Sequence, residues 1–196
     1  MSFLVTKQAP DFAAKAVMPD NSIVDLTLSS FRGKYVILFF YPLDFTFVCP
    51  SEIIAFDRKL KEFKDRDCEV VGVSVDSEYS HWAWKNTSVD KGGIGNVQYP
   101  LVSDITKRIS RDYGILFEDS VALRGLFLID REGIIRHAVV NDLSLGRSID
   151  EALRMLDALQ FTETHGEVCP ANWKKGEEGM EASAQGVAKY LSEHAV

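Results

Sequence analysis

Three cysteines are the residues best able to carry covalent chemistry in this chain: Cys49, Cys68 and Cys169. Their number is odd and no two stand in C-x-x-C spacing, which makes both a structural disulfide framework and a zinc site poor interpretations. In a reducing compartment, isolated cysteines either fill the core or perform chemistry. Cys49 is the strongest candidate for chemistry because Pro50 follows it, and proline favours the first position of a helix.

As the expected N-cap of this helix, Cys49 would lie at the positive end of the helix dipole, among backbone N–H groups that have no helical partner. A thiol placed there ionises below its usual pKa of ~8.5, and the thiolate is the nucleophilic form. The alternative is that Cys49 is a small, buried filler residue. Its position favours catalysis over that alternative.

Thr46 and Arg124 are the polar residues that could act with Cys49. Thr46 stands three residues earlier, so its hydroxyl could reach the sulfur or could form a turn hydrogen bond. Arg124 interrupts the apolar stretch 123–129, where a buried guanidinium is costly unless an anion meets it. That anion is either a carboxylate such as Glu52 or a thiolate, and the residues alone leave both open.

Apolar periodicity predicts the elements that position these residues. Continuous apolar runs at 35–41 and 70–75 predict strands buried on both faces. Helices are expected from Pro50 to about Lys64, over 78–86, over 104–112 with Asp104 as cap, and from Ser148 to about Leu159. The segments 121–129 and 134–140 flank a turn at 130–133 and predict a hairpin. Together they predict an α/β fold with a mixed central sheet and flanking helices.

A C-terminal extension follows this core, which gives an expected division into 1–161 and 162–196. The stretch 162–179 lacks periodicity and contains Cys169, and long unstructured segments on a compact domain are often functional. Apolar residues then return at helical spacing, which predicts a C-terminal helix with an apolar face. A tail that leaves the core and docks again suggests a partner subunit or a mobile lid.

Composition excludes several classes of protein. The 196 residues are 46% apolar and 26% charged, which excludes disorder and coiled coil, and the net charge of −7 without a basic block argues against a nucleic-acid partner. The longest apolar run is too short to span a membrane, and no signal-peptide core follows the N-terminus, so a cytoplasmic location is expected. The four histidines are scattered, so no metal site is expected.

The stretch 39–56, FFYPLDFTFVCPSEIIAF, is similar to the active-site segment of typical two-cysteine peroxiredoxins (the alkyl hydroperoxide reductase C and thioredoxin peroxidase family). Pro42, Thr46 and Cys49 match the family pattern Pro-x-x-x-Thr/Ser-x-x-Cys. The resemblance covers nearly the whole chain, including the segments 9–12, 73–77, 124–127, 141–143, 146–148 and 165–170. It implies a thioredoxin-like fold and peroxide reduction by cysteine alone, with no metal, haem or flavin cofactor.

The resemblance also implies a role for each matching residue. Cys49 would attack the peroxide and become a sulfenic acid. Thr46 would hydrogen-bond the peroxide, Arg124 would polarise it and stabilise the thiolate, and Pro42 would shield the pocket from water. Glu52 and Arg147 resemble a supporting polar network. The substrates would be hydrogen peroxide and alkyl hydroperoxides, in antioxidant defence and cell redox homeostasis.

Cys169 resembles the resolving cysteine, which in this family comes from the other subunit of a homodimer. It would form an intersubunit disulfide with Cys49, reopened by thioredoxin or a similar dithiol. Resembling proteins assemble dimers into rings such as decamers, and Phe45 and the stretch 77–84 are the candidate ring contacts. Cys68 matches no redox motif and is expected to be structural.

Two other functions compete with peroxidase turnover. A peroxide sensor or holdase chaperone would use the same oxidation to change its assembly and expose apolar surface. A thioredoxin-type disulfide oxidoreductase is disfavoured because the chain has no C-x-x-C pair.

Overall fold

The computed structural model describes residues 3–194, and the chain divides into two compact units, Met1–Ile149 and Asp150–Val196. The two units are described separately below. The division expected after residue 161 falls inside a helix, α5 (Ile149–His165), most of which belongs to the second unit.

A seven-stranded sheet forms the centre of the first unit, in the order β2-β1-β5-β4-β3-β8-β9. The β3–β4 and β4–β5 pairs are parallel and the other neighbours are antiparallel, which confirms the expected mixed sheet. The strands are β1 (Ala13–Val17), β2 (Ile23–Thr27), β3 (Tyr35–Phe40), β4 (Cys68–Ser74), β5 (Leu101–Ser103), β8 (Arg124–Ile129) and β9 (Ile135–Asn141). The sequence prediction had missed β1, β2 and β5.

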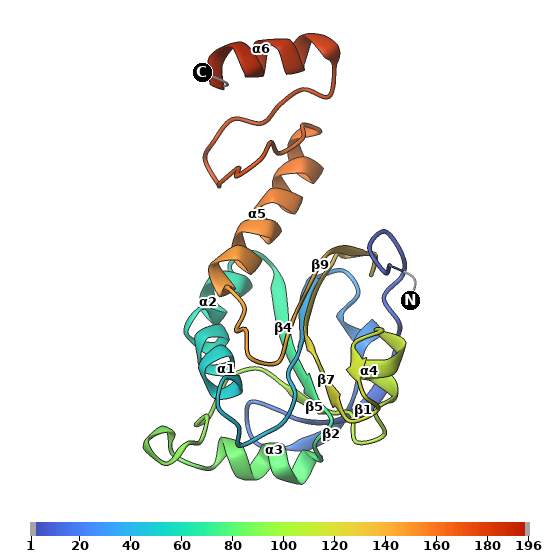
Figure 1. The fold of residues 1–196 in the computed structure, drawn as a ribbon, viewed down its shortest axis with the longest axis vertical. Helices are drawn as coiled ribbons and strands as arrows, with labels where there is room; N and C mark the ends of the chain where they lie inside the picture. The colour runs from blue at the N-terminus through green and yellow to red at the C-terminus, as the bar shows by residue number, and fades with distance from the viewer. Residues whose placement is uncertain (1–2, 195–196) are drawn as a thin grey trace. The chain divides into compact units, whose positions relative to one another are not determined.

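Helices lie on both faces of this sheet, as Figure 1 shows, so the α/β class is confirmed. They are α1 (Cys49–Arg58), α2 (Leu60–Lys64), α3 (Glu78–Lys85) and α4 (Arg108–Asp112), with short 3-10 helices at Leu28–Phe31 and Val89–Lys91. A separate two-stranded sheet pairs β6 (Leu116–Phe117) with β7 (Val121–Ala122).

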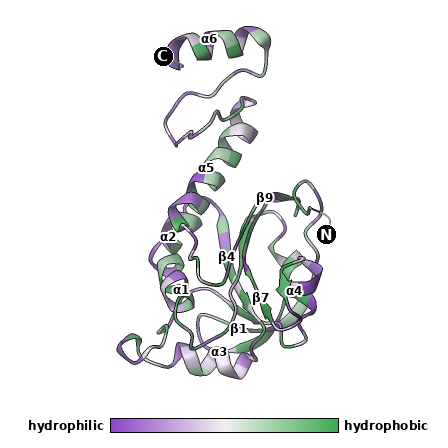
Figure 2. Ribbon diagram, viewed as in Figure 1, coloured by the Kyte–Doolittle hydropathy of each residue, from purple (hydrophilic) through white to green (hydrophobic). Residues whose placement is uncertain are grey.

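Strand β3 explains how the core is built, because all six of its residues are buried. Alternate side chains of a strand point to opposite faces of the sheet. Phe39 stacks on Phe56 of α1 at 4.4 Å between ring centroids, whereas Phe40 packs against Tyr113 on the other side of the sheet at 5.1 Å. Each face therefore has its own apolar layer, and Figure 2 shows much of the sheet in the green of hydrophobic residues.

Gly72 makes room for the aromatic layer on the α1 face. It is the cross-strand partner of Phe39, and a Cβ at Gly72 would lie 3.0 Å from the Phe39 ring and 2.8 Å from Leu101. The Phe39 ring of β3 occupies the space that a side chain at position 72 would need, and there it stacks on Phe56 of α1.

The expected helix from Pro50 to about Lys64 is wrong in one respect: it is two helices, α1 and α2, separated at Lys59. The backbone of Lys59 leaves helical geometry (φ −97°, ψ 1°). Leu60 and Phe63 nevertheless remain buried, which is why the apolar spacing continued across the break.

Two further boundaries also differ from the sequence prediction. The helix expected from Asp104 begins only at Arg108, although the Asp104 carboxylate still caps it by accepting from the N–H groups of Ile109 (3.0 Å) and Ser110 (2.7 Å). The strand expected over 121–129 is divided at Leu123, so that β7 joins the small sheet and β8 the large one. The hairpin turn at 130–133 is confirmed between β8 and β9.

The second unit consists of α5, an irregular segment and α6 (Ala184–His194), so the predicted C-terminal helix is confirmed. The predicted end of α5 near Leu159 is wrong because the helix continues to His165. The hydroxyls of Thr162 and Thr164 donate to the carbonyls of Leu159 and Gln160, so these polar groups have partners within the helix. The helix ends before Gly166, whose φ is +70°.

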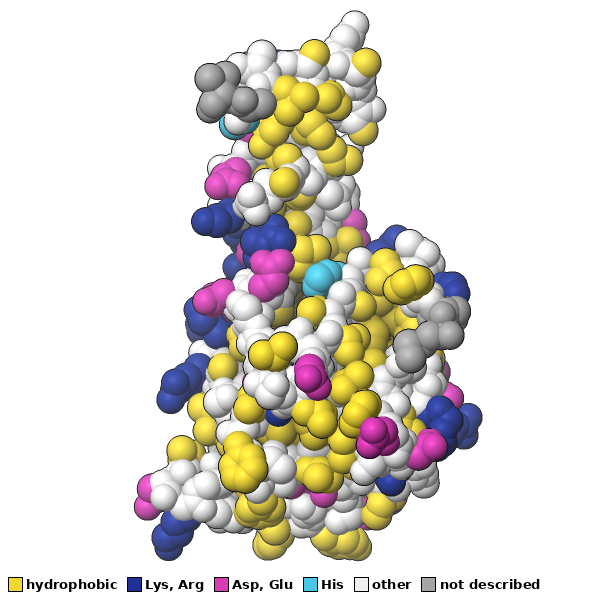
Figure 3. Space-filling view, in the orientation of Figure 1, with side chains coloured by type: hydrophobic (Ala, Val, Ile, Leu, Met, Phe, Trp, Pro, Cys, Tyr) yellow, Lys and Arg dark blue, Asp and Glu magenta, His cyan; other side chains and the backbone are white. Residues whose placement is uncertain are grey.

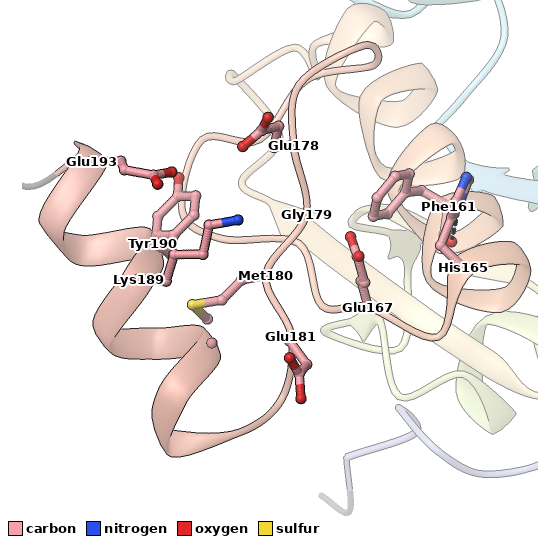
Figure 4. Close-up of a pocket in the computed structure, with 11 residues that line it drawn as sticks. Phe161, His165, Glu167, Glu178, Gly179, Met180, Glu181, Lys189, Tyr190 and Glu193 are labelled. Carbon is pink, nitrogen blue, oxygen red and sulfur yellow. Dashed lines mark hydrogen bonds between the residues drawn. The ribbon is translucent and has the colours of Figure 1, made fainter.

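The irregular segment is held together by a β-bridge between Val168 and Met180. Beside this bridge lies a cavity of about 420 Å³, which Figure 4 shows between the end of α5 and the face of α6. Its lining combines aromatic rings with carboxylates, among them Phe161, Tyr190, Glu167 and Glu193. In the described part of the chain, no helix is both long enough and apolar enough to cross a membrane.

We expect the packing of α1 on the sheet to contribute strongly to stability. Ile53 of α1 is fully buried, so Ile53→Ala should lower the free energy of unfolding by about 2–5 kcal/mol. Ile105→Ala is the matched control, because that side chain is 61% exposed and its loss should change stability by less than about 0.5 kcal/mol. Urea denaturation measures both, and equal losses would show that α1 is not held by this buried face.

Candidate active site

Cys49 lies at the first turn of α1 and is fully buried. The expectation that Cys49 is the N-cap is wrong by one residue, because Val48 occupies that position and Cys49 is already helical. The Val48 carbonyl accepts the first helical bonds, from the N–H of Ser51 (3.1 Å) and of Glu52 (3.4 Å). Cys49 remains at the positive end of the helix dipole, where a negative charge is stabilised.

Arg124 reaches Cys49 from the opposite side of this site. It is the first residue of β8, and its Nη1 lies 3.4 Å from the Cys49 Sγ. The same Nη1 donates to Glu52 Oε2 at 2.7 Å, and its Nε donates to the Leu143 carbonyl at 2.7 Å. The two partners that the sequence left open for Arg124, a carboxylate and the thiol, are therefore both in contact with it.

Glu52 and Arg147 complete the buried cluster. The backbone N–H and Nε of Arg147 both donate to Glu52 Oε1 at 2.8 Å, and Nη2 donates to Oε2 at 3.0 Å. Arg147 Nη1 donates to the carbonyls of Phe40 and Gly125, which ties the loop after β9 to β3 and β8. The structure thus brings together four of the sequence-predicted residues, Cys49, Glu52, Arg124 and Arg147.

The charges of this cluster do not balance without Cys49. Arg124 and Arg147 carry two positive charges and Glu52 one negative charge, so these three buried residues sum to +1. Burial alone would raise the pKa of the Glu52 carboxyl, but Arg147, with Arg124, holds that pKa below its usual range. Because Glu52 stays ionised, the remaining positive charge favours a second anion, and the Cys49 sulfur is in contact with it.

Pro42 and Thr46 lie in the loop between β3 and α1. Pro42 is buried, and Thr46 is partly exposed. The Thr46 hydroxyl donates to the Leu43 carbonyl at 2.9 Å, which is the turn bond that the sequence allowed. Across the described residues, no hydrogen bond joins Thr46 to Cys49. The loop therefore places Thr46 near the start of α1, with its hydroxyl oxygen still able to accept.

A polar cluster that the sequence analysis missed holds this loop in place. The Asp44 carboxylate accepts from the Tyr41 hydroxyl (2.9 Å) and the Ser80 hydroxyl (2.7 Å) and lies 2.8 Å from His81 Nδ1. The Asp44 N–H donates to Asp76 Oδ2 at 2.7 Å. His81 is fully buried although it had looked like one of several scattered histidines. The only signal in the sequence was Asp76, which directly follows the apolar run 70–75.

The other two cysteines lie in different surroundings. Cys68 is buried at the start of β4, and burial raises the pKa of its thiol far above the usual range. Cys169 belongs to the irregular segment of the second unit and is partly exposed, with Sγ 3.6 Å from the Ala158 carbonyl. All three cysteines are free. Over residues 3–194, no three histidine, cysteine or carboxylate side chains form a group that could hold a metal ion.

Comparisons with known proteins show which family the chain is similar to. Residues 5–138 match the AhpC/TSA family, and residues 158–193 match the C-terminal domain of 1-Cys peroxiredoxin. The chain is 60% identical to alkyl hydroperoxide reductase C of Helicobacter pylori (strain J99), over 98% of both chains. It is 52% identical to a thioredoxin peroxidase of Echinococcus granulosus, over 98% of this chain and 100% of that one.

A solved structure extends the comparison to the fold. The reduced 2-Cys peroxiredoxin of Plasmodium vivax is 57% identical and superposes with a TM-score of 0.96, covering 97% of this chain and all of that one. The thioredoxin-like fold implied by the sequence resemblance is confirmed. The site itself has a buried cysteine thiol at a helix start, beside a guanidinium whose charge is only partly neutralised by Glu52. The chain belongs to the AhpC/TSA family of peroxiredoxins and is a thiol-based peroxidase of the two-cysteine type.

Proposed function

We propose that the protein reduces hydrogen peroxide and organic hydroperoxides, with Cys49 as the peroxidatic cysteine. The observation that carries this proposal is the contact between Arg124 and the Cys49 sulfur inside a cluster that has one excess positive charge. The same guanidinium can stabilise the thiolate before the reaction and the oxygen that departs during it. Pro42 excludes water from the loop side of the pocket.

The first step is attack of the Cys49 thiolate on the terminal peroxide oxygen. An S–O bond forms and the O–O bond breaks, so that sulfur is oxidised to the sulfenic acid while the peroxide is reduced. The departing oxygen takes a proton and leaves as water or an alcohol. Thr46 has an hydroxyl oxygen that can accept a hydrogen bond from the peroxide, since its proton is engaged with the Leu43 carbonyl.

In the second step, Cys169 of another subunit condenses with the sulfenic acid at Cys49. The product is an intersubunit disulfide, which thioredoxin or a similar dithiol reopens by exchange. A thioredoxin peroxidase among the relatives supports this choice of reductant. We place the reaction in the cytoplasm, where dithiol reductants keep such cysteines reduced.

We also propose that the working form is a homodimer assembled into a ring. Strand β9 is outermost in the sheet order, and among the described residues no further strand follows it, which leaves an edge where a second copy can pair. Tyr79 and Trp82 of α3 and Phe45 of the loop are 71%, 46% and 53% exposed. Figure 3 shows apolar side chains gathered at the bottom of the molecule, where Figure 1 places α3. These residues are our candidate contacts between dimers.

A non-reducing gel after one equivalent of peroxide tests the cysteine roles. Wild type and Cys68→Ser should form disulfide-linked dimers, because Cys68 is buried with a raised thiol pKa. Cys49→Ser and Cys169→Ser should lose the Cys49–Cys169 linkage. A monomeric band for oxidised wild type, with an internal Cys49–Cys169 bond found by peptide mapping, would contradict the intersubunit step.

Sustained turnover separates the enzyme from a sensor. With thioredoxin, thioredoxin reductase and peroxide, the wild type should consume NADPH continuously, in step with peroxide loss. A single stoichiometric oxidation with no further consumption would leave only the sensor or holdase function.

Replacing Arg124 by Leu should slow peroxide reduction by about 10²–10³-fold, the loss typical of removing one donor that stabilises charge in a transition state. Alkylation of Cys49 by iodoacetamide at pH 7 should slow as well, because the thiolate loses its neighbouring charge. Arg108→Leu is the control, since that side chain is 81% exposed and remote from this cluster in its contacts.

Arg124→Lys keeps the charge but not the branched donor, so its rate should lie between the wild type and Arg124→Leu. Circular dichroism shows whether each variant is folded. A folded Arg124→Leu with near-normal turnover and alkylation would make Arg124 a structural residue only.

A further inference from the structure

The segment 169–173, which begins with Cys169, packs against one face of α5. Arg154, Ala158 and Phe161 stand at positions i, i+4 and i+7 of the helix, which lie on the same face. Arg154 Nη1 donates to the Trp173 carbonyl at 2.8 Å, and the Cys169 Sγ lies 3.6 Å from the Ala158 carbonyl. The rings of Phe161 and Trp173 are 4.8 Å apart. One helix face thus holds both Cys169 and the residue four positions after it.

Arg154 is itself held rigidly on this face. Its Nε and Nη2 donate to the two carboxylate oxygens of Glu151 at 2.6 and 2.7 Å, a bidentate pair one turn earlier on the helix. Nη2 also lies 3.1 Å from the Met155 sulfur. The Arg154 side chain is only 27% exposed. Because these contacts fix the guanidinium, its charge stays in place beside the Cys169 segment.

Arg154 and Cys169 lie against the same face of α5, so the guanidinium charge is close to the thiol. Partial burial holds the pKa of the Cys169 thiol above its usual value, and the Arg154 charge opposes part of that rise. Two other charged residues of α5 lie near this face. Glu151 is paired with Arg154, and Asp157 is paired with Lys175 at 3.1 Å. Arg154 is therefore the group placed to offset the cost of ionising Cys169.

We propose that Arg154 is the positioning residue of the resolving step: it fixes the Cys169 segment through the Trp173 carbonyl and stabilises Cys169 as a thiolate. This inference rests on the proposed function, in which Cys169 resolves the sulfenic acid. None of the motifs singled out in the sequence includes Arg154, which there is one residue of an ordinary amphipathic helix.

The reaction shows why the charge matters. The Cys169 thiolate attacks the Cys49 sulfenic sulfur, an S–S bond forms and the S–O bond breaks. The Cys169 sulfur is oxidised, the Cys49 sulfur is reduced, and the departing hydroxide takes a proton to become water. A positive charge beside Cys169 therefore raises the fraction of the thiol that is present as the attacking thiolate.

The first experiment measures the ionisation of Cys169 directly, in a Cys49→Ser, Cys68→Ser background where it is the only thiol. The rate of iodoacetamide alkylation against pH reports its pKa. Arg154→Gln, which keeps a donor for the Trp173 carbonyl but removes the charge, should lower the rate at pH 8 by about 3–10-fold. Arg154→Lys should restore most of it, and the exposed Lys189→Gln is the charge control.

The second experiment follows a single turnover of the otherwise unmodified protein in a rapid-mixing instrument. Arg154→Gln should form the Cys49 sulfenic acid at the wild-type rate, which also shows that it is folded, but should form the disulfide about 10-fold more slowly at pH 7. Arg154→Lys should again recover most of the rate. Lys189→Gln should match the wild type in both phases.

Either of two results would overturn the inference. One is a Cys169 pH profile in Arg154→Gln that coincides with that of the Cys49→Ser, Cys68→Ser parent. The other is an Arg154→Lys variant that resolves as slowly as Arg154→Gln, since a purely structural role would not be rescued by charge. A wild type that never forms the Cys49–Cys169 disulfide would refute the proposed function, while the alkylation profile would still decide the role of Arg154.

Discussion

Glu52 shares one carboxylate between two buried guanidinium groups, and the arrangement of the active site follows from that imbalance. Arg147 uses its backbone N–H and two side-chain nitrogens on Glu52, and Arg124 adds a fourth donor. Removing such charges from water is costly unless each finds a partner. Glu52 alone cannot neutralise both arginines, so the site retains a positive charge next to the Cys49 sulfur. The Cys49 sulfur is the group that contacts this excess charge, through Arg124.

The sheet makes this charge cluster possible. Arg124 begins β8 and Phe40 ends β3, two neighbouring antiparallel strands whose registers place Phe39 opposite Leu126. Helix α1 lies over the same face through the Phe39–Phe56 stack, which positions Cys49 and Glu52 one turn apart above the strand ends. Asp44 ties the loop 41–48 to Ser80 and His81 of α3. The start of β8 and the start of α1 therefore meet at the Cys49 sulfur.

Cys49 and Cys169 lie in different environments within the chain. Cys49 is fully buried beside a guanidinium that also binds Glu52, and this suits the proposed reaction with a small, uncharged peroxide. Cys169 is partly exposed on an irregular segment, near an arginine that is fixed to its own helix. In the function proposed above, Cys169 meets a second subunit and later a dithiol, and its accessibility fits that role.

Much of the site could be predicted from residue types and spacing. A buried arginine in an apolar strand is costly unless an anion lies beside it. A cysteine before a proline at a helix start lies where a thiolate is stabilised. Both features can be recognised from local sequence alone. The apolar runs of β3, β4 and β8 likewise identify buried strands, because strands covered on both faces leave no alternation. The short strands β1, β2 and β5 escaped prediction since three to five residues carry too little pattern to separate a strand from a loop.

Other features were decided only by the tertiary structure. That Arg124 contacts both Glu52 and Cys49, rather than one of them, depends on the register of β8 against β3 and on the packing of α1 over these strands. The helix α5 continues through 162–165, beyond the apolar spacing that predicted it. The contact of Asp44 with His81 joins residues 37 positions apart. The sequence by itself determined which side chains need partners and which element carries each of them. Which partner each one finds was decided by folding, because pairing between distant segments is set by strand register and packing rather than by local composition.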